Sequence, residues 1–271
     1  MSVRSHSPES SPLYEKARAL FTSAGFETPE LEARFFAEAF AGREEETVQK
    51  LLRRRLAGEP LAYLEGARGF WKHEFQISPD VLIPRPDSEV LVEWALELIP
   101  ALGAGTVLDL GTGSGCLLLS ILSDLPDVAG IGVDLSPSAL EVARENGDRL
   151  GLTERVQWIQ SSWLEEVRLP ENAFLVANPP YIDPKEKVGP GVREYEPHQA
   201  LFSPPEDPLA FYRAILQQLA EVAPSGFPTL FEVGAQRMEG LCALAQSIGF
   251  EVMEQRKDLG GIPRAVYLRR N

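Results

Sequence analysis

The sequence predicts an α/β fold in which a mainly parallel sheet carries helices on both faces. From Thr106 onward, short apolar runs typical of buried strands alternate with longer runs of helical periodicity. Glycines follow the first of these strands, as they do where a backbone turns sharply against a ligand. The residues before about position 66 show helical patterns only. We therefore expect a small helical domain followed by a larger α/β domain.

Three amphipathic helices are expected between Pro12 and about Leu56, because apolar residues recur there every three or four positions. The residues of their apolar faces are Leu13, Ala17, Leu20 and Phe21, then Leu31, Phe35, Phe36 and Phe40, then Val48, Leu51 and Leu52. The third helix ends in Arg53-Arg54-Arg55, where basic side chains suit the helix dipole; a basic contact patch is the alternative. Residues 1 to about 11 are rich in serine and proline, and we expect them to be disordered.

A β-hairpin is expected to join the two domains. Apolar and polar residues alternate from Gly69 to Leu82, and Ser78-Pro79-Asp80 supplies a turn. We place the helical domain at residues 1–65, the hairpin linker at 66–84 and the larger domain at 85–271. The larger domain opens with a helix to about Leu98, which Asp87 or Ser88 is expected to cap.

The α/β domain is expected to contain seven strands. The predicted strands are 106–110, 129–134, 155–160, 173–178, 228–233 and two more near 250–256 and 264–269, which form an antiparallel hairpin at one edge. The predicted helices between them are 114–123, 136–150, 207–222 and 235–248. Residues Asp183 to Pro205 show no clear period, and we expect a mobile substrate loop there.

Composition narrows the class of protein and its partners. No apolar run is long enough to span a membrane, and the N-terminus lacks the apolar core of a signal peptide. Cys116 and Cys242 are the only cysteines and fit no metal-ligand spacing, so we expect a cytoplasmic protein without a metal. We also expect a monomer. The net charge of −14 argues against nucleic-acid binding and favours a protein partner with a basic surface. The alternative is that the negative charge only increases solubility and has no role in binding a partner.

A glycine-rich turn marks a ligand site. The strand that ends at Leu110 runs into Gly111-Thr112-Gly113-Ser114-Gly115, and a helical run follows. This spacing differs from the G-x-G-x-x-G dinucleotide pattern, and no Walker lysine accompanies it. About twenty residues on, the next strand ends in Asp134, a carboxylate suited to a ribose diol. Alone, the glycines would also fit an ordinary tight turn.

The turn Asn178-Pro179-Pro180-Tyr181 follows a buried strand. Two prolines stiffen the exit from the sheet, and the asparagine amide offers both a donor and an acceptor. Such a turn can hold a planar –NH2 group and cover it with an aromatic ring, although an ordinary proline-rich loop is the alternative. Because ligands bind beyond the carboxyl ends of parallel strands, this turn should meet the glycine turn and Asp134 in one crevice. Trp163 can pack there on an adenine face.

These motifs, in this order, are similar to those of class I S-adenosylmethionine-dependent methyltransferases that act on planar amino groups. Further motifs narrow the resemblance to the peptide chain release factor N5-glutamine methyltransferases (the HemK/PrmC family). They are Gly58-Glu59-Pro60-Leu61-Ala62-Tyr63-Leu64-Glu65-Gly66, Phe70, Ile83-Pro84-Arg85-Pro86-Asp87-Ser88-Glu89, Tyr195-Glu196-Pro197, Ala200-Leu201, Phe211-Tyr212-Arg213, Phe231-Glu232-Val233-Gly234, Gln236 and Lys257-Asp258-Leu259. The resemblance covers almost the whole chain.

The resemblance implies a Rossmann-like class I methyltransferase domain and a role for each motif. The implied cofactor-binding residues are Gly111, Thr112, Gly113, Ser114 and Gly115 for the methionine and ribose part, Asp134 for the ribose, Trp163 for the adenine region, and Asn178. The implied catalytic and glutamine-binding residues are Asn178, Pro179 and Tyr181, with Pro180 in the same pocket. The implied partner is a release factor, and the helical residues 12–65 would recognise it.

Three positions depart from the family pattern. Ser162 stands where an acid is common before the tryptophan, and Ser88 stands where a threonine is common, which keeps the hydroxyl. The stretch from Phe202 to Leu209 is rich in proline where the family has glycines, so this loop should be stiffer.

The chemistry follows from the weak nucleophile. Resonance draws the lone pair of a glutamine amide nitrogen into its carbonyl. Hydrogen bonds from its two N–H groups to the Asn178 side-chain oxygen and the Pro179 carbonyl would favour attack on a methyl group and stabilise the charge that develops. A nucleic-acid exocyclic-amino methyltransferase (adenine-N6 or guanine-N2) and a catalytically idle binding module remain as alternatives.

Overall fold

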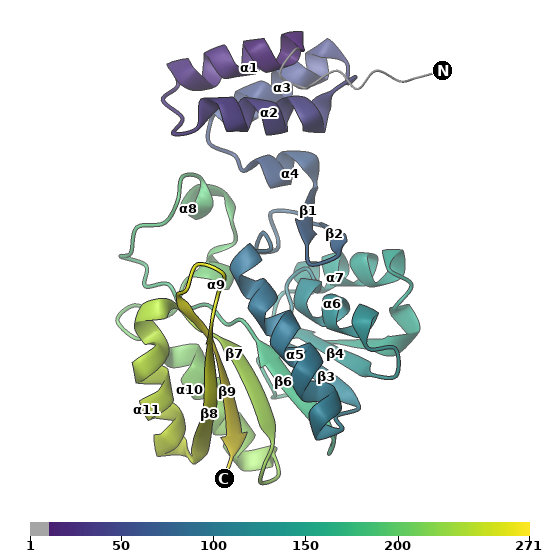
Figure 1. Cartoon of the computed structure of the whole chain (residues 1–271), viewed down its shortest axis with the longest axis vertical. Helices are drawn as coiled ribbons and strands as arrows, with labels where there is room; N and C mark the ends of the chain where they lie inside the picture. Colours follow the sequence, from purple (N-terminus) through teal and green to yellow (C-terminus); the bar gives the residue numbers. More distant parts are fainter. Residues whose placement is uncertain (1–10) are drawn as a thin grey trace. The chain divides into compact units, whose positions relative to one another are not determined.

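The computed structural model describes residues 11–271 and divides them between two compact units (Figure 1). The smaller unit comprises residues 11–66 and Gly189–Tyr195, and the larger unit comprises Ala67–Val188 and Glu196–Asn271. Within the smaller unit, the Tyr195 hydroxyl donates to the Ala57 carbonyl at 3.0 Å. No helix within residues 11–271 is both long enough and apolar enough to cross a bilayer.

The smaller unit is a helical bundle. Its helices are α1 (Pro12–Ser23), α2 (Pro29–Phe40), α3 (Glu45–Leu56), the short α4 (Leu61–Glu65) and α8 (Val192–Tyr195). The three long helices confirm the sequence prediction, and their apolar faces enclose a core that includes Phe21, Phe36 and Phe40. Ser11, expected in a disordered segment, instead accepts a hydrogen bond from the Tyr14 backbone and caps α1. The rest of that prediction, residues 1–10, lies outside the described residues.

The arginine run at the end of α3 has partners within its own unit. Arg54 pairs with Glu59 at 2.5 Å, and Arg55 pairs with Glu32 at 2.9 Å. Arg53 completes the basic last turn, where all three side chains oppose the negative end of the helix dipole.

A two-stranded hairpin opens the larger unit, with a turn that differs from the predicted one. Strand β1 (Ala67–Phe70) pairs with β2 (His73–Gln76), so the chain reverses at Trp71-Lys72 and not at Ser78–Asp80. Trp71 adopts a left-handed φ of 54°. Its backbone N–H donates to Glu89 and its indole N–H donates to Asp124, both at 2.9 Å. These two anchors fix the reversal at a residue whose sequence gives no turn signal.

The seven-stranded sheet has the order β5-β4-β3-β6-β7-β9-β8. Its strands are β3 (Thr106–Leu110), β4 (Ala129–Asp134), β5 (Val156–Gln160), β6 (Ala173–Ala177), β7 (Pro228–Glu232), β8 (Phe250–Lys257) and β9 (Pro263–Arg270). The first five are parallel, and β9 runs antiparallel to both β7 and β8. The predicted antiparallel hairpin at one edge is therefore confirmed.

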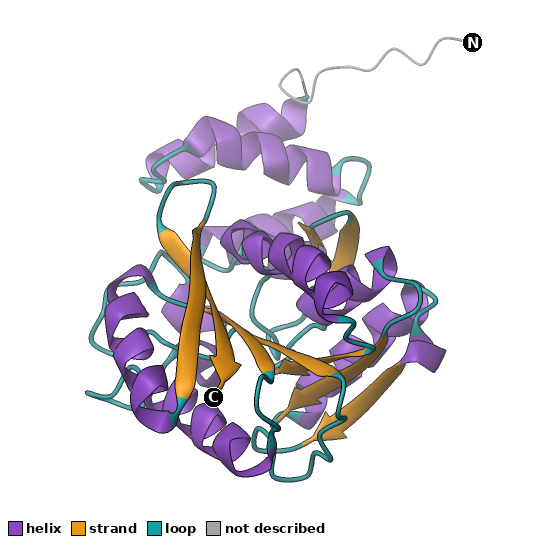
Figure 2. Cartoon of the chain, turned by 60° about the horizontal axis from the view of Figure 1, so that its bottom comes forward, coloured by secondary structure: helices purple, strands orange, loops and turns teal. Residues whose placement is uncertain are grey.

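Helices cover both faces of this sheet (Figure 2). The main helices are α5 (Glu89–Leu102), α6 (Cys116–Asp124), α7 (Pro137–Arg149), α10 (Ala210–Val222) and α11 (Met238–Ile248); shorter turns are η2 (Pro86–Ser88), η3 (Thr153–Arg155), α9 (His198–Leu201) and η4 (Ala235–Arg237). Successive side chains of β6 alternate between the two cores: Leu175 packs with α10 and α11, whereas Phe174 and Val176 pack with α5 and α6.

The topology creates a crevice between β3 and β6. The chain moves outward from β3 through β4 to β5 and then crosses to β6, on the other side of β3. Leu110 and Ala177, the last residues of these two strands, are partners in the parallel register. The turns that begin at Gly111 and Asn178 therefore start side by side, at the switch point where open α/β sheets bind ligands.

Candidate active site

A cavity of about 330 Å³ lies at the carboxyl end of the sheet. It collects residues from both turns of the switch point and from strand β4. The predicted site residues on its wall are Gly111, Gly113, Asp134, Trp163, Asn178 and Pro180. Other parts of the wall were not predicted from the sequence for this role. They come from Pro79–Leu82, Ser161, Phe211, Pro197, Gln199 and Ala200.

The glycine turn is held by backbone hydrogen bonds that require left-handed residues. Gly111 and Gly113 have φ angles of 74° and 55°. The N–H groups of Gly111 and Thr112 donate to the Val133 carbonyl at 2.8 and 2.9 Å. Glycine adopts this conformation without the penalty that a Cβ atom brings, so the turn can expose backbone to the cavity.

Asp134 fixes the turn and lines the cavity at the same time. Its Oδ2 accepts from the Gly113 N–H and its Oδ1 from the Ser136 N–H, both at 2.9 Å. Burial raises the pKa of this carboxyl, and the two backbone N–H groups oppose that rise. Each oxygen keeps further lone pairs, which suit hydroxyl donors such as those of a ribose.

Three residues predicted to bind cofactor do not line the cavity. Thr112 donates its hydroxyl to Asp109 at 2.6 Å, and the Ser114 carbonyl accepts from Asn146 at 2.9 Å. Gly115 has a φ of 78° at the start of α6, where a Cβ atom would lie 3.0 Å from Leu119. Thr112, Ser114 and Gly115 therefore shape the turn, and Gly111 and Gly113 are the residues of the turn that line the cavity.

Asp109, near the end of β3, is a buried acid beneath the glycine turn. It is 1% exposed, and one of its oxygens has no hydrogen-bond partner among the described residues. Burial raises its pKa to about 7, against the hydrogen bond from Thr112 that lowers it.

Two aromatic rings form one wall of the cavity. Trp163 and Phe211 have ring centroids 5.5 Å apart. Trp163 holds a φ of 56°, a strained conformation for a bulky residue and one that clusters at functional sites. Phe211 belongs to a motif that carried the family resemblance, but only the packing of α10 reveals its place at the cavity.

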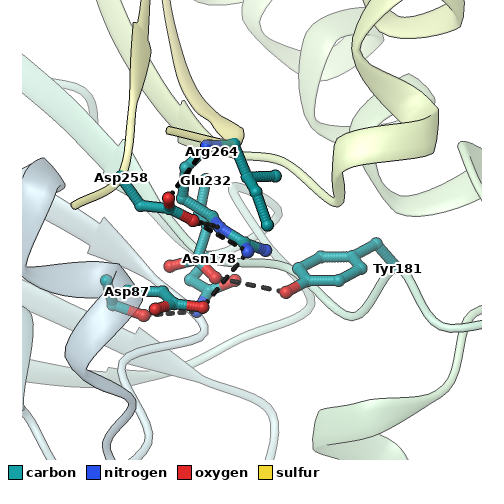
Figure 3. Close-up of polar contacts among 8 residues, drawn as sticks. Asp87, Asn178, Tyr181, Glu232, Asp258 and Arg264 are labelled. Carbon is teal, nitrogen blue, oxygen red and sulfur yellow. Dashed lines mark hydrogen bonds and ion pairs between the residues drawn. The ribbon is translucent and has the colours of Figure 1, made fainter. Parts of the chain in front are cut away.

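The Asn178 turn rests on a polar cluster, which Figure 3 shows. The Asn178 amide nitrogen donates to the Ser88 hydroxyl over 3.4 Å, and the Tyr181 hydroxyl donates to Glu232 over 3.3 Å. Pro180 lines the cavity, whereas Pro179 and Tyr181, predicted as catalytic, do not. Gly234 makes room for the Tyr181 ring, since a Cβ atom there would lie 2.8 Å from it.

Ser88 stands at the N-cap position of α5, directly before Glu89, without capping the helix through its side chain. We expected Asp87 or Ser88 to cap this helix, but neither makes a capping hydrogen bond through its side chain. The Ser88 hydroxyl instead contacts Asn178, and Asp87 pairs with Arg264 at 3.1 Å. Both side chains are directed to the site by tertiary contacts that override the local preference.

Glu232 is the buried acid at the centre of this cluster. It is 2% exposed, and its Oε2 has no partner of standard geometry among the described residues. Burial raises its pKa, while the nearby Ser88 side chain and the charge of Arg264 oppose the rise. Arg264 is itself held by Asp258 at 3.0 Å.

Comparisons with known proteins decide the family. Residues 88–193 match the family described as methyltransferase small domain. The chain is 41% identical over 244 residues to the release factor glutamine methyltransferase of Bradyrhizobium diazoefficiens, with 88% of this chain and 80% of that protein covered. The chain belongs to the release factor glutamine methyltransferase family. A family member from Caulobacter vibrioides is 33% identical over 268 residues and covers 92% of both chains.

The fold is also that of distant methyltransferases. A ribosomal protein L11 methylase from Lactobacillus delbrueckii superposes with a TM-score of 0.52 at 15% identity, covering 75% of this chain and 90% of that one. This likeness supports the Rossmann-like class I architecture predicted from the sequence.

The cavity fits S-adenosylmethionine, the methyl donor of this family. Left-handed glycines leave backbone open on one side, a half-buried carboxylate lies at the end of β4, and the two aromatic rings offer a flat apolar wall. These features match, in turn, the methionine part, the ribose diol and the adenine of that molecule.

Proposed function

We propose that this protein transfers a methyl group from S-adenosylmethionine to the side-chain amide nitrogen, N5, of a glutamine in peptide chain release factors. The observation that carries this proposal is the placement of Asn178 on the cavity wall directly beside the glycine turn. An amide acceptor there lies next to the site proposed for the methyl donor. The family to which the chain belongs supports the same reaction and substrate class.

The proposed chemistry relies on preorganised acceptors. S-adenosylmethionine supplies an electrophilic methyl group on a sulfonium centre. The Asn178 side-chain oxygen and the Pro179 carbonyl accept hydrogen bonds from the glutamine –NH2 group and orient its lone pair. The two prolines fix both acceptors before the substrate arrives, so little ordering cost falls on the reaction. The methylated nitrogen then loses a proton to water, which removes the need for a strong base.

We propose that the pocket for the glutamine is completed by Pro180 and Tyr181. Pro180 lines the cavity. The Tyr181 ring is fixed on two sides, by its hydroxyl at Glu232 and by its packing against Gly234. A ring held in this way keeps one orientation and does not have to be ordered by the substrate.

Recognition of the release factor is proposed to reside in the helical residues 12–65. A glutamine side chain is small and common, so a second contact surface is needed to select one glutamine in a large protein. Leu31 and Phe35 of α2 are each 42% exposed and offer apolar contact area. Deleting residues 1–65 should leave donor affinity intact and raise KM for release factor strongly, with folding checked by circular dichroism. If a folded truncated enzyme methylates the release factor as efficiently as the full chain does, the helical residues do not recognise the release factor.

The acidic surface favours a protein substrate over a nucleic acid. With 40 acidic and 26 basic residues, the chain carries a net charge of −14 and would repel a phosphate backbone. We propose that the protein acts as a monomer in the cytoplasm, without binding nucleic acid or membrane.

In the deciding experiment, the purified protein is incubated with isotopically labelled methyl donor and either release factor or RNA. Mass spectrometry then locates the label. We expect one methyl group on one glutamine of the release factor and none on RNA. Label on adenine or guanine would establish the nucleic-acid activity instead, and no label on either substrate would indicate a binding module.

A further inference from the structure

Asn146 is a buried amide on helix α7 that bonds to two distant segments of the chain. The residue is 1% exposed, and α7 lies beside strand β2 (Figure 1). The Asn146 side-chain oxygen accepts from the Gln76 N–H at 2.7 Å, and its nitrogen donates to the Gln76 and Ser114 carbonyls, both at 2.9 Å. A backbone N–H only donates and a carbonyl only accepts, so these partners fix the direction of the amide.

Both segments that Asn146 holds continue into the wall of the cavity. Gln76 ends β2, and the wall residues Pro79–Leu82 begin three positions later. Ser114 directly follows Gly113, which lines the cavity from the glycine turn. Asn146 itself does not line the cavity. Its influence on a ligand must therefore pass through these two segments.

The wall segment Pro79–Leu82 is also held at its other end. Directly after Leu82, the Ile83 N–H donates to the buried Glu196 carboxylate at 3.2 Å. Loss of the Asn146 bonds would release the Gln76 end of this segment while the Ile83 end stays attached. The wall could then move away from the glycine turn.

Helix α7 gives Asn146 a firm support against the glycine turn. The Ser136 hydroxyl caps this helix by accepting from the Ala139 N–H at 3.2 Å. Ala143, one turn before Asn146, packs against the start of α6, where a Cβ atom added at Gly115 would lie 3.3 Å from the Ala143 Cβ. Such close packing leaves the helix little freedom to shift. The amide therefore joins a movable wall segment to a fixed base.

We propose that Asn146 is a positioning residue for the methyl donor: it holds the wall Pro79–Leu82 against the glycine turn and so keeps the cavity in its binding-competent form. This role deepens the proposed methyltransferase function and rests on it, because the donor is taken to occupy this cavity. A cavity that is competent for only part of the time binds its ligand more weakly, in proportion to that fraction. Bound donor should in turn stabilise the Asn146 bonds.

The binding test measures the affinity of the full-length enzyme for S-adenosylmethionine by calorimetry. Asn146→Asp is nearly isosteric and keeps an acceptor for the Gln76 N–H, but it turns an oxygen toward the two carbonyls that the amide nitrogen served. Because two buried acceptors lose their donor, we expect a dissociation constant at least about tenfold higher. KM for release factor, measured at saturating donor, should stay within about twofold of wild type. Asn146→Ala should weaken donor binding similarly.

Arg155→Met is the matched control. The Arg155 guanidinium donates to the Leu125 and Val128 carbonyls at 2.5 and 2.6 Å, and none of these three residues lines the cavity. This variant also deprives two backbone carbonyls of a side-chain donor, so it should lose stability but bind donor normally. A folded Asn146→Asp enzyme that binds donor within about twofold of wild type would overturn the role of Asn146. Donor binding equally weak in Arg155→Met would do the same.

A second readout uses the wild-type enzyme alone and so does not require the Asn146 variants to fold. Hydrogen exchange of the Gln76 N–H should be slower with S-adenosylmethionine than without it, because bound donor favours the bonded wall. Equal exchange rates would overturn the role of Asn146. Slower exchange in an enzyme that methylates no glutamine would instead overturn the proposed function and leave the role of Asn146 in place.

Discussion

The Arg85 guanidinium and the Glu196 carboxylate form an ion pair with a distance of 2.5 Å across 111 positions of sequence. The Glu196 side chain is fully buried, and it also accepts from the Ile83 N–H at 3.2 Å. Pro197, Gln199 and Ala200, which follow it closely, line the cavity. This pair therefore ties one wall of the cavity to the segment that precedes α5.

Removing the arginine should destabilise the enzyme. Arg85→Met leaves the Glu196 carboxylate buried without a cation, a change that typically costs about 3–5 kcal/mol, with the lower end expected because Arg85 is 37% exposed. Donor affinity should fall as the wall loosens. Thermal unfolding and calorimetry measure both effects.

The same substitution at Arg18 provides the control. Arg18 pairs with Glu15 on the surface of α1, and both side chains are largely exposed. Surface pairs of this kind contribute little, so Arg18→Met should leave stability and donor affinity unchanged. Equal stability of the Arg85 and Arg18 variants would show that the buried pair does not hold the cavity wall.

Asp134→Ala should weaken donor binding more than it slows transfer at saturating donor. The carboxylate faces the cavity and also holds the Gly113 and Ser136 N–H groups. A charged hydrogen bond contributes about 1.5–3 kcal/mol, which corresponds to a dissociation constant roughly 10- to 100-fold higher. Isothermal calorimetry gives this constant directly. An unchanged value would reduce Asp134 to a structural role at the end of β4.

Phe211→Ala should weaken donor binding about tenfold. Its ring packs beside Trp163 on the cavity wall, and such aromatic contacts contribute about 0.5–1.5 kcal/mol beyond area burial. Val222→Ala, at an exposed position of the same helix, is the control and should bind donor normally. Wild-type affinity in the Phe211 variant would show that the ring does not touch the donor.

Asp109→Asn should stabilise the enzyme at alkaline pH. Burial raises the Asp109 pKa from 3.8 to about 7. Between these values the folded state keeps a proton that the unfolded chain has lost, so the wild-type stability falls as pH rises and the full penalty is present above pH 7. Asparagine carries no charge. The variant should therefore unfold at a higher temperature than wild type at pH 8, and the difference should vanish near pH 4.

Asp124→Asn should show the opposite pH dependence. Hydrogen bonds from Lys72 and Trp71 lower the Asp124 pKa below its ordinary 3.8. That stabilisation is present above the unfolded value and is lost as pH falls through the folded one. The variant should be less stable than wild type at pH 8, with a difference that shrinks in acid. Parallel pH profiles for the Asp109 and Asp124 variants would contradict both assignments.

The sequence predicted the parts of the site that local patterns encode. Glycine spacing, an acid at the end of β4 and a double-proline turn each have a mechanism that is readable within a few residues, and Gly111, Asp134 and Asn178 do meet at one cavity. Parallel strands bring their carboxyl ends together, so the convergence followed from the alternation of strands and helices.

The sequence-based predictions that were wrong concern contacts between distant segments of the chain. The hairpin reverses at Trp71 because Glu89 and Asp124 anchor it, and Ser88 leaves its cap position for Asn178. The buried carboxylate of Glu232 belonged to a recognised motif, yet its role depends on the pairing of β7 with β6. No local pattern carries that information, because each partner lies many positions away.

The central claim is that Asn178 presents its oxygen to the glutamine amide during transfer. Asn178→Ala tests it most directly in a single-turnover measurement with saturating donor and release factor, with donor affinity measured on the same preparation. Loss of one preorganised acceptor predicts a transfer rate about 10²–10³ lower with a donor dissociation constant near the wild-type value. A folded variant that binds donor normally and transfers methyl at a near wild-type rate would contradict the account.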